Sequence, residues 1–287
     1  MTADETRTSF KQLAQVFPRS KTIQCYGAGI LWKVSLFSQE WKDKIVSLDG
    51  IRIVCECLKF NIQCHKCCQH CCWLLSSLAY KNYSRCEVIA QCNAIELITD
   101  MLKLHSKHVY VLEAGFSVLN NLSLKRELTG SDSNEMMIAN EESQRRMQID
   151  SLGGVQLLAD ALQIHKNKKF VVRKAVSALS YLCIGEEEIF EKLIERGSLK
   201  DIFCVLETHT KDKKVSRNCL ALLGHILNNP KLLLQVLRGY SQNPAVLTYF
   251  YEMIARNLET DKFDEDWRNQ FGQLILENIE MVLSHTR

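Results

Sequence analysis

Apolar residues recur along this chain at steps of three and four positions, which is the spacing of one face of an α-helix. The strict alternation of apolar and polar residues that marks β-strands is absent, and 287 residues include only 12 glycines and 3 prolines. The interruptions coincide with turn-forming pairs such as Asp49-Gly50 and Gly153-Gly154. The pattern predicts a chain that is nearly all helix.

One apolar segment occurs five times in the same register. It reads GAGILWKVSL from residue 27, CCWLLSSLA from 71, GFSVLNNLS from 115, AVSALSYLC from 175 and CLALLGHIL from 219. A leucine marks each copy, at intervals of 44, 44, 60 and 44 residues: Leu31, Leu75, Leu119, Leu179 and Leu223. The 16 extra residues of the long interval match the polar stretch 125–140, KRELTGSDSNEMMIAN. We therefore expect a 44-residue repeat with one inserted, mobile loop at 125–140.

Each repeat contains two further amphipathic runs. A run introduced by a turn residue precedes the marked segment, as in GIRIVCECLKF and GGVQLLADALQI, and another connects successive repeats, as in EEEIFEKLIERG. The pattern predicts three helices per repeat, with a glycine before the second helix and A-x-x-x-L-x-x-L in the third. These features resemble the armadillo repeat. The related HEAT repeat has a similar length and stays an alternative. The resemblance covers nearly the whole chain. It implies an all-α, right-handed α-solenoid of about five to six armadillo-like repeats, a single domain over 1–287 with degenerate end caps at 6–17 and 244–287.

The resemblance also implies a concave groove, lined by the third helices, that binds an extended peptide or a partner helix. Family members that hold extended peptides use an asparagine near the end of the third helix and a tryptophan one turn earlier. The asparagine position here holds Lys33, Ser77, Asn121, Tyr181 and His225, and the tryptophan position holds Gly29, Trp73, Ser117, Ser177 and Ala221. Only Asn121 and Trp73 match, which argues against an importin-like reader of basic nuclear signals. For Trp73 a core position is the alternative.

Positive charge recurs on the same predicted face. Two turns before the asparagine position the chain reads Cys25, Gln69, Glu113, Arg173 and Arg217, and one turn further back it has Lys169 and Lys213. Stacking should place the four cations side by side as a basic ladder with a step of about 10 Å, which favours an acidic or phosphorylated protein segment as the partner. The alternative is a solvated surface that only aids solubility. The candidate partner-binding residues are Lys33, Gln69, Trp73, Ser77, Glu113, Asn121, Lys169, Arg173, Tyr181, Lys213, Arg217 and His225.

Residues 64–72, CHKCCQHCC, hold five cysteines and two histidines in nine positions. A zinc site needs four ligands in tetrahedral geometry. One face of a single helix can supply only two or three of them, so a second segment would have to supply the rest. In the repeat register the cysteines at 67, 68, 71 and 72 correspond to Val111, Leu112, Gly115 and Phe116, where the third helix packs. A reduced buried cysteine behaves as a small hydrophobe. We expect a metal-free, reduced run and no cofactor, with a metal- or redox-responsive site in Cys64–Cys72 as the alternative.

Composition narrows the functional class. With 46% apolar and 24% charged residues the chain is typical of a soluble globular protein, and a net charge of +3 is too small for general nucleic-acid binding. The N-terminus, MTADETRTSF, has no signal-peptide pattern, no apolar run is long enough to span a membrane, and catalytic motifs such as H-E-x-x-H and G-x-S-x-G are missing. We expect a non-enzymatic scaffold or adaptor of the cytoplasm or nucleus, part of a larger complex, that binds protein rather than nucleic acid or membrane. A regulatory cofactor of a chaperone or small GTPase is the alternative function.

Overall fold

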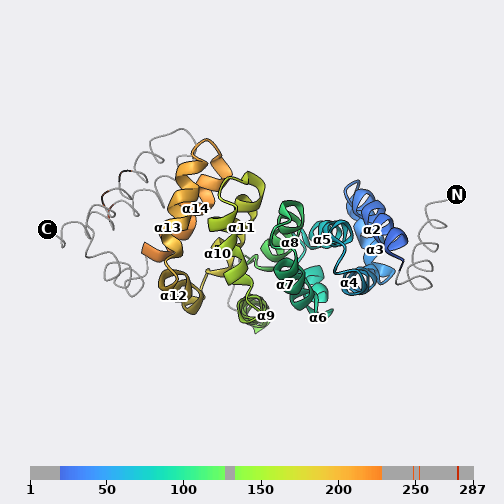
Figure 1. Cartoon of the computed structure of the whole chain (residues 1–287). Helices are drawn as coiled ribbons and strands as arrows, with labels where there is room; N and C mark the ends of the chain where they lie inside the picture. Colours follow the sequence, from blue (N-terminus) through green and yellow to red (C-terminus); the bar gives the residue numbers. More distant parts are fainter. Residues whose placement is uncertain (1–19, 127–132, 228–247, 249–251, 253–276, 278–287) are drawn as a thin grey trace. The chain divides into compact units, whose positions relative to one another are not determined.

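The computed structural model describes residues 20–126 and 133–227, together with positions 248, 252 and 277 (Figure 1). The described ranges contain thirteen helices and no strand. The helices are α2 (Lys21–Ser35), α3 (Gln39–Ser47), α4 (Gly50–Phe60), α5 (His65–Ala79), α6 (Tyr83–Gln91), α7 (Ala94–Leu104), α8 (Val109–Leu122), α9 (Ser133–Ser151), α10 (Gly154–Ile164), α11 (Lys169–Leu182), α12 (Glu187–Glu195), α13 (Ser198–Thr208) and α14 (Lys213–Leu227). The expected end caps at 6–17 and 244–287 fall outside these ranges.

The helices follow one another in threes, as the sequence repeat predicts. After α2, the third helix of the first copy, come the repeats α3–α5, α6–α8, α9–α11 and α12–α14. The chain divides into two compact units between Leu157 and Leu158, within α10. The first unit contains α2 to α9, and the second contains α11 to α14.

A residue in the left-handed conformation immediately precedes the second helix of every described repeat. Asp49, Asn93, Gly153 and Gly197 occupy equivalent positions and have φ values of 63°, 55°, 86° and 72°. Glycine adopts this conformation without strain, and Asn and Asp tolerate it better than other residues. This turn chemistry fixes the angle at which the second helix leaves the first.

The marked leucines form the core. Leu75, Leu119 and Leu179 have no exposed surface, Leu223 is 2% exposed, and Leu31 is half-buried. In the first unit α5 packs against both α2 and α8, and in the second unit α11 packs against α14. The third helices therefore bury their apolar faces on one another, which confirms the register read from the sequence.

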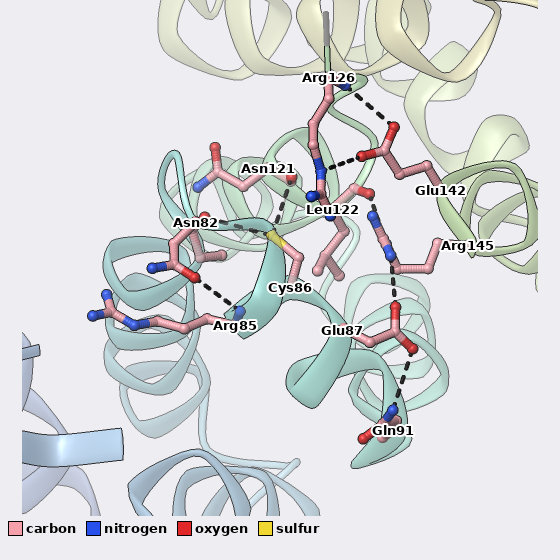
Figure 2. Close-up of polar contacts among 11 residues, drawn as sticks. Asn82, Arg85, Cys86, Glu87, Gln91, Asn121, Leu122, Arg126, Glu142 and Arg145 are labelled. Atoms are coloured by element: carbon pink, nitrogen blue, oxygen red, sulfur yellow. Dashed lines mark hydrogen bonds and ion pairs between the residues drawn. The ribbon is translucent and has the colours of Figure 1, made fainter. Parts of the chain in front are cut away.

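Two buried arginines connect repeats in the first unit. Arg145 on α9 donates to Glu87 on α6 at 2.6 Å and to the carbonyl oxygen of Leu122 at 3.4 Å (Figure 2). Arg85 on α6 makes the equivalent contacts one repeat earlier, with Asp43 on α3 and a carbonyl at the end of α5. Each guanidinium thus ties its own first helix to both the first and the third helix of the repeat before it. A buried cation is tolerated only with partners of this kind.

The expectation of a mobile loop at 125–140 is wrong for residues 133–140, which form the first part of α9. The start of the segment is also held in place. The backbone N–H and Nε of Arg126 donate to the buried carboxylate of Glu142 at 3.2 and 3.0 Å (Figure 2). The Arg126 guanidinium also lies 4.4 Å from the centre of the Tyr83 ring. The insertion is therefore largely an extension of a first helix, and residues 127–132 lie outside the described part.

Truncating a marked leucine tests the register. Leu179→Ala should lower the free energy of unfolding by about 2 to 5 kcal/mol, because it removes a fully buried side chain and leaves a cavity. Ile164→Ala is the matched control, since Ile164 is 67% exposed and its truncation should cost less than about 0.5 kcal/mol. Urea titrations of both variants measure the two values, and equal losses would contradict the register.

Candidate functional site

Two of the sequence-predicted binding residues are engaged inside the protein. Asn121 on α8 is 6% exposed, and its Nδ2 donates to the carbonyl oxygen of Ser76 at 2.9 Å and to the Ser76 hydroxyl at 3.1 Å. Ser77 is 9% exposed and accepts a hydrogen bond from the Ser35 hydroxyl at 2.8 Å. Both side chains connect neighbouring third helices, so little of either is left on the surface for a partner.

Trp73 belongs to an aromatic stack that the sequence did not indicate. Its ring lies 5.8 Å from the ring of Trp32 on α2, at an interplanar angle of 17°, and both tryptophans are half-buried. The exposed Lys33 places its Nζ 4.2 Å from the Trp32 ring centre, a cation–π contact. Trp73 is therefore neither a core residue nor an isolated surface residue, but one layer of a stack between α2 and α5.

The predicted basic ladder contains an internal carboxylate. Lys169 and Arg173 on α11 both bind Asp212, which precedes α14, with Nζ–Oδ2 and Nη2–Oδ2 distances of 2.9 and 2.5 Å. Asp212 also accepts hydrogen bonds on Oδ1 from the backbone N–H groups of Lys214 and Val215, at 3.0 and 3.1 Å, and so caps α14. The structure thus brings Lys169 and Arg173 together around Asp212, a partner that the recurrence of positive charge does not indicate.

The surroundings of Asp212 keep it ionised. Burial alone raises the pKa of this carboxyl, but the hydrogen bonds from Lys169, Arg173 and Val215 outweigh burial and hold the pKa well below its usual range. In the sequence, the segment KDKK has a single aspartate among lysines at the start of a helix. An aspartate in this position is the sequence feature that indicates an N-cap.

The other two ladder residues, Lys213 and Arg217 on α14, are exposed. They belong to a larger cationic surface, the basic corner, which we define as residues 166–174 and 211–217. These segments hold nine lysines and arginines against one acidic residue, Asp212. They lie side by side, since His209 Nε2 is 2.7 Å from the Lys166 carbonyl oxygen and α11 packs on α14.

The remaining predicted residues lie on four different third helices. Gln69 on α5, Glu113 on α8 and Tyr181 on α11 are each partly exposed. His225 lies in α14, and its side chain is outside the described part.

Three cysteine sulfurs meet in the core of the repeat α3–α5. Cys57 Sγ on α4 lies 3.5 Å from Cys67 Sγ and 3.4 Å from Cys71 Sγ, and the latter two, one turn apart on α5, are separated by 4.0 Å. The exposed fractions are 3%, 0% and 0%. We call these three atoms the sulfur triangle. In the described part of the chain it is the one group of three or more potential metal ligands gathered within 4.8 Å.

Hydrogen bonding within the sulfur triangle is uneven. Bonds from Cys57 and Cys71 lower the pKa of the Cys67 thiol. The bond with Cys67 and burial raise the pKa of the Cys57 thiol, although its bond with Cys71 opposes this rise, and the bonds that Cys71 makes with Cys57 and Cys67 raise the pKa of the Cys71 thiol. The other two buried cysteines of the run have different partners, because Cys68 Sγ lies 3.2 Å from the Ile62 carbonyl oxygen and Cys72 Sγ lies 3.5 Å from Met101 Sδ. Cys57 lies outside the run 64–72, ten residues before Cys67 and on another helix, so the composition of the run does not indicate it.

A cleft of about 510 Å³ between α4 and α7 contains a second thiol pair, Cys55 and Cys92. A hydrogen bond from Cys55 lowers the pKa of the Cys92 thiol to about 7. The described lining residues include no histidine that could act as a base, and charged side chains such as Arg52 and Glu56 line the walls. This geometry does not assemble a nucleophile with its base.

No protein-family model matches the sequence, and no curated protein is similar to it in sequence. Solved structures share the fold. A designed armadillo repeat protein superposes with a TM-score of 0.67 at 14% identity, covering 96% of this chain and 99% of the designed one. An engineered protein solved by the Northeast Structural Genomics Consortium gives a TM-score of 0.69 at 16% identity, over 96% and 97% of the two chains. A second engineered protein from this consortium gives 0.56 at 17% identity, over 94% and 68%.

The chain has an armadillo-like repeat fold. This confirms the all-α solenoid fold that the sequence predicts, and at 14% to 17% identity the likeness concerns the fold alone. None of the armadillo-like helices in the described ranges combines the length and the apolar character needed to cross a bilayer.

Asp212 binds two cations and caps α14, and substitutions at this position test the two roles separately. Asp212→Asn keeps a capping side chain but removes the charge that binds Lys169 and Arg173, so it should cost about 1 to 3 kcal/mol near pH 7. Asp212→Ala should cost about 1 kcal/mol more, because it also removes the cap.

The cost of Asp212→Asn should depend on pH. Because the folded-state pKa of Asp212 is depressed, its contribution is complete above the unfolded pKa of about 3.9 and is lost as the pH falls toward the folded value. Urea titrations from about pH 7 to about pH 3 should show wild type and Asp212→Asn converging below about pH 4. A constant difference over this range would mean that Asp212 does not titrate with a lowered pKa.

Proposed function

We propose that the protein is a non-enzymatic binding scaffold whose second unit holds an acidic or phosphorylated segment of a partner protein at the basic corner. The concentration of charge carries this proposal: nine lysines and arginines stand against one aspartate within sixteen residues of two adjacent segments. An armadillo-like repeat fold supports a binding role in general, because stacked repeats present an extended surface.

Several of these cations lie at helix starts, where they add to the positive potential of the helix N-terminus. Lys168 and Lys169 stand at the start of α11, Lys213 and Lys214 stand at the start of α14, and neither helix has an acidic residue in its first turn. The N-terminal end of a helix is the positive end of its dipole, so cations there add to the positive potential. An anionic ligand relieves this repulsion and also meets the geometry that helix N-termini offer to phosphate and carboxylate groups.

Asp212 organises the basic corner without neutralising it. Its carboxylate fixes the Arg173 guanidinium, which is 25% exposed, and the Lys169 ammonium, which is 50% exposed. Lys213 and Arg217 remain exposed on the following helix. A short anionic segment therefore finds pre-positioned cations on one side and accessible ones on the other, which favours charge-assisted and bidentate contacts.

A protein segment suits the basic corner better than a nucleic acid does. Nucleic-acid affinity comes from many phosphate contacts along a basic face, whereas the excess here is local and the whole chain has a net charge of only +3. A peptide with a few acidic or phosphorylated residues matches a patch of this extent.

Charge reversal at Lys213 and Arg217 tests the proposal. Fluorescence anisotropy with the full chain and a labelled phosphoserine-rich peptide should show binding that weakens at least tenfold in Lys213→Glu/Arg217→Glu and falls as salt is raised, since exposed charges are screened beyond about 8 Å. Arg173 is left unchanged, because a glutamate there would face Asp212 and destabilise the fold. Lys192→Glu/Lys200→Glu is the matched control, with the same charge change on exposed positions of α12 and α13.

Three results would contradict the proposal. The first is equal affinity of both double variants for the peptide. The second is tight binding of an unphosphorylated neutral peptide of the same length. The third is preferential binding of a single-stranded oligonucleotide that carries the same charge.

A further inference from the structure

The sulfur triangle has the dimensions of a metal site. Its sides measure 3.4, 3.5 and 4.0 Å. Ligand sulfurs in a tetrahedral site with metal–sulfur bonds of about 2.3 Å lie about 3.8 Å apart. An ion can therefore contact Cys57, Cys67 and Cys71 after side-chain adjustments of a few tenths of an ångström. Helix α5 supplies Cys67 and Cys71, and α4 is the second segment, which supplies Cys57.

The equivalent positions in the other described repeats show that packing does not require sulfur there. They hold Met101, Val111 and Gly115 in α6–α8, Ala161, Val171 and Ala175 in α9–α11, and Val205, Val215 and Cys219 in α12–α14, all buried. The three positions of α9–α11 contain no sulfur, and each of the other two sets contains one sulfur-bearing residue, Met101 or Cys219. In the described part of the chain only α3–α5 has a thiol at all three positions, so packing alone does not account for them.

Thiolate ligands select soft ions such as Cu(I) and Zn(II). Structural zinc takes four ligands. Among the described residues, no fourth histidine, cysteine or carboxylate has a ligand atom within 4.8 Å of all three sulfurs. Cu(I) is stable with two or three sulfur ligands. We propose that Cys57, Cys67 and Cys71 bind one soft metal ion between α4 and α5, with three-coordinate Cu(I) favoured over Zn(II).

Burial determines how such an ion is loaded and what it does. Each coordinating thiol releases its proton as the metal–sulfur bond forms. Since the three sulfurs are nearly inaccessible, the ion enters as α4 packs against α5 during folding, or when they separate transiently. Once bound, it crosslinks the second and third helices of one repeat, and binding to the folded state alone stabilises that state.

The experiment uses the full chain, reduced and refolded without oxygen, with Cu(I) or Zn(II) supplied in separate arms. After desalting against a weak competing chelator, elemental analysis should find one copper per chain, and X-ray absorption should show three sulfur neighbours. The copper-loaded protein should melt at a higher temperature than the metal-free protein.

A matched pair of variants locates the site. Cys57→Ala/Cys67→Val/Cys71→Ala reproduces the residues of α9–α11, which pack in this same chain, and should lose the copper and the rise in melting temperature. Cys68→Val/Cys72→Val is the control, because it removes two buried cysteines of α5 whose sulfurs contact Ile62 and Met101 instead, and should keep both.

Wild-type protein gives a second readout should the triple variant fail to fold. Bound metal should protect Cys57, Cys67 and Cys71 from alkylation during partial unfolding, with the modified residues identified by mass spectrometry. The proposal is overturned if neither metal is retained, or if copper persists in the folded triple variant. Protection confined to the more accessible Cys64 and Cys92 would overturn it as well. One zinc and no copper, lost in the triple variant, would keep the site but overturn the preference for Cu(I).

Discussion

The third helix of each repeat has an apolar face that its own repeat cannot cover, and the packing of these helices on one another supports the rest of the structure. α5 packs between α2 and α8, and α11 packs on α14. Burial of a leucine side chain contributes about 1.5 to 3 kcal/mol, so one leucine per repeat at the same register position gives a large and evenly distributed stabilisation. This packing places residues 44 positions apart next to each other within a unit.

The fixed register repeats polar contacts as well as apolar ones. His105 Nε2 lies 2.7 Å from the Ile62 carbonyl oxygen, and His209 Nε2 lies 2.7 Å from that of Lys166, at equivalent positions. The pairs of Arg85 with Asp43 and of Arg145 with Glu87 are related in the same way. Each contact satisfies a polar group at the junction of two repeats, where an unsatisfied group would weaken their packing.

The sequence predicted the features that depend on register alone. Period, helix triplets, buried leucines and the proximity of Lys169 to residues of α14 all follow from which positions repeat every 44 residues. The choice of polar partner did not follow, because it depends on side-chain distances of a few ångströms. Asn121 donates to Ser76 on the neighbouring third helix, and Asp212 binds Lys169 and Arg173 of the ladder. Residues 133–140 lack an apolar face of their own, yet they continue a helix that Glu142 and Arg145 anchor further along.

One register position carries different chemistry in different repeats. His65 begins α5, where its ring stacks on His108 at 4.9 Å, whereas the equivalent residues Lys169 and Lys213 begin α11 and α14 in the basic corner. The core does not constrain these positions. On α14 the exposed Lys213 and Arg217 flank Val215 and Ser216, which are fully buried. The buried residues determine how α14 packs, and the exposed ones add charge to the surface of the helix. A loss of binding on charge reversal at Lys213 and Arg217 reports on the partner contact when the free energy of unfolding of the variant stays within about 0.5 kcal/mol of wild type, the usual scatter of surface substitutions.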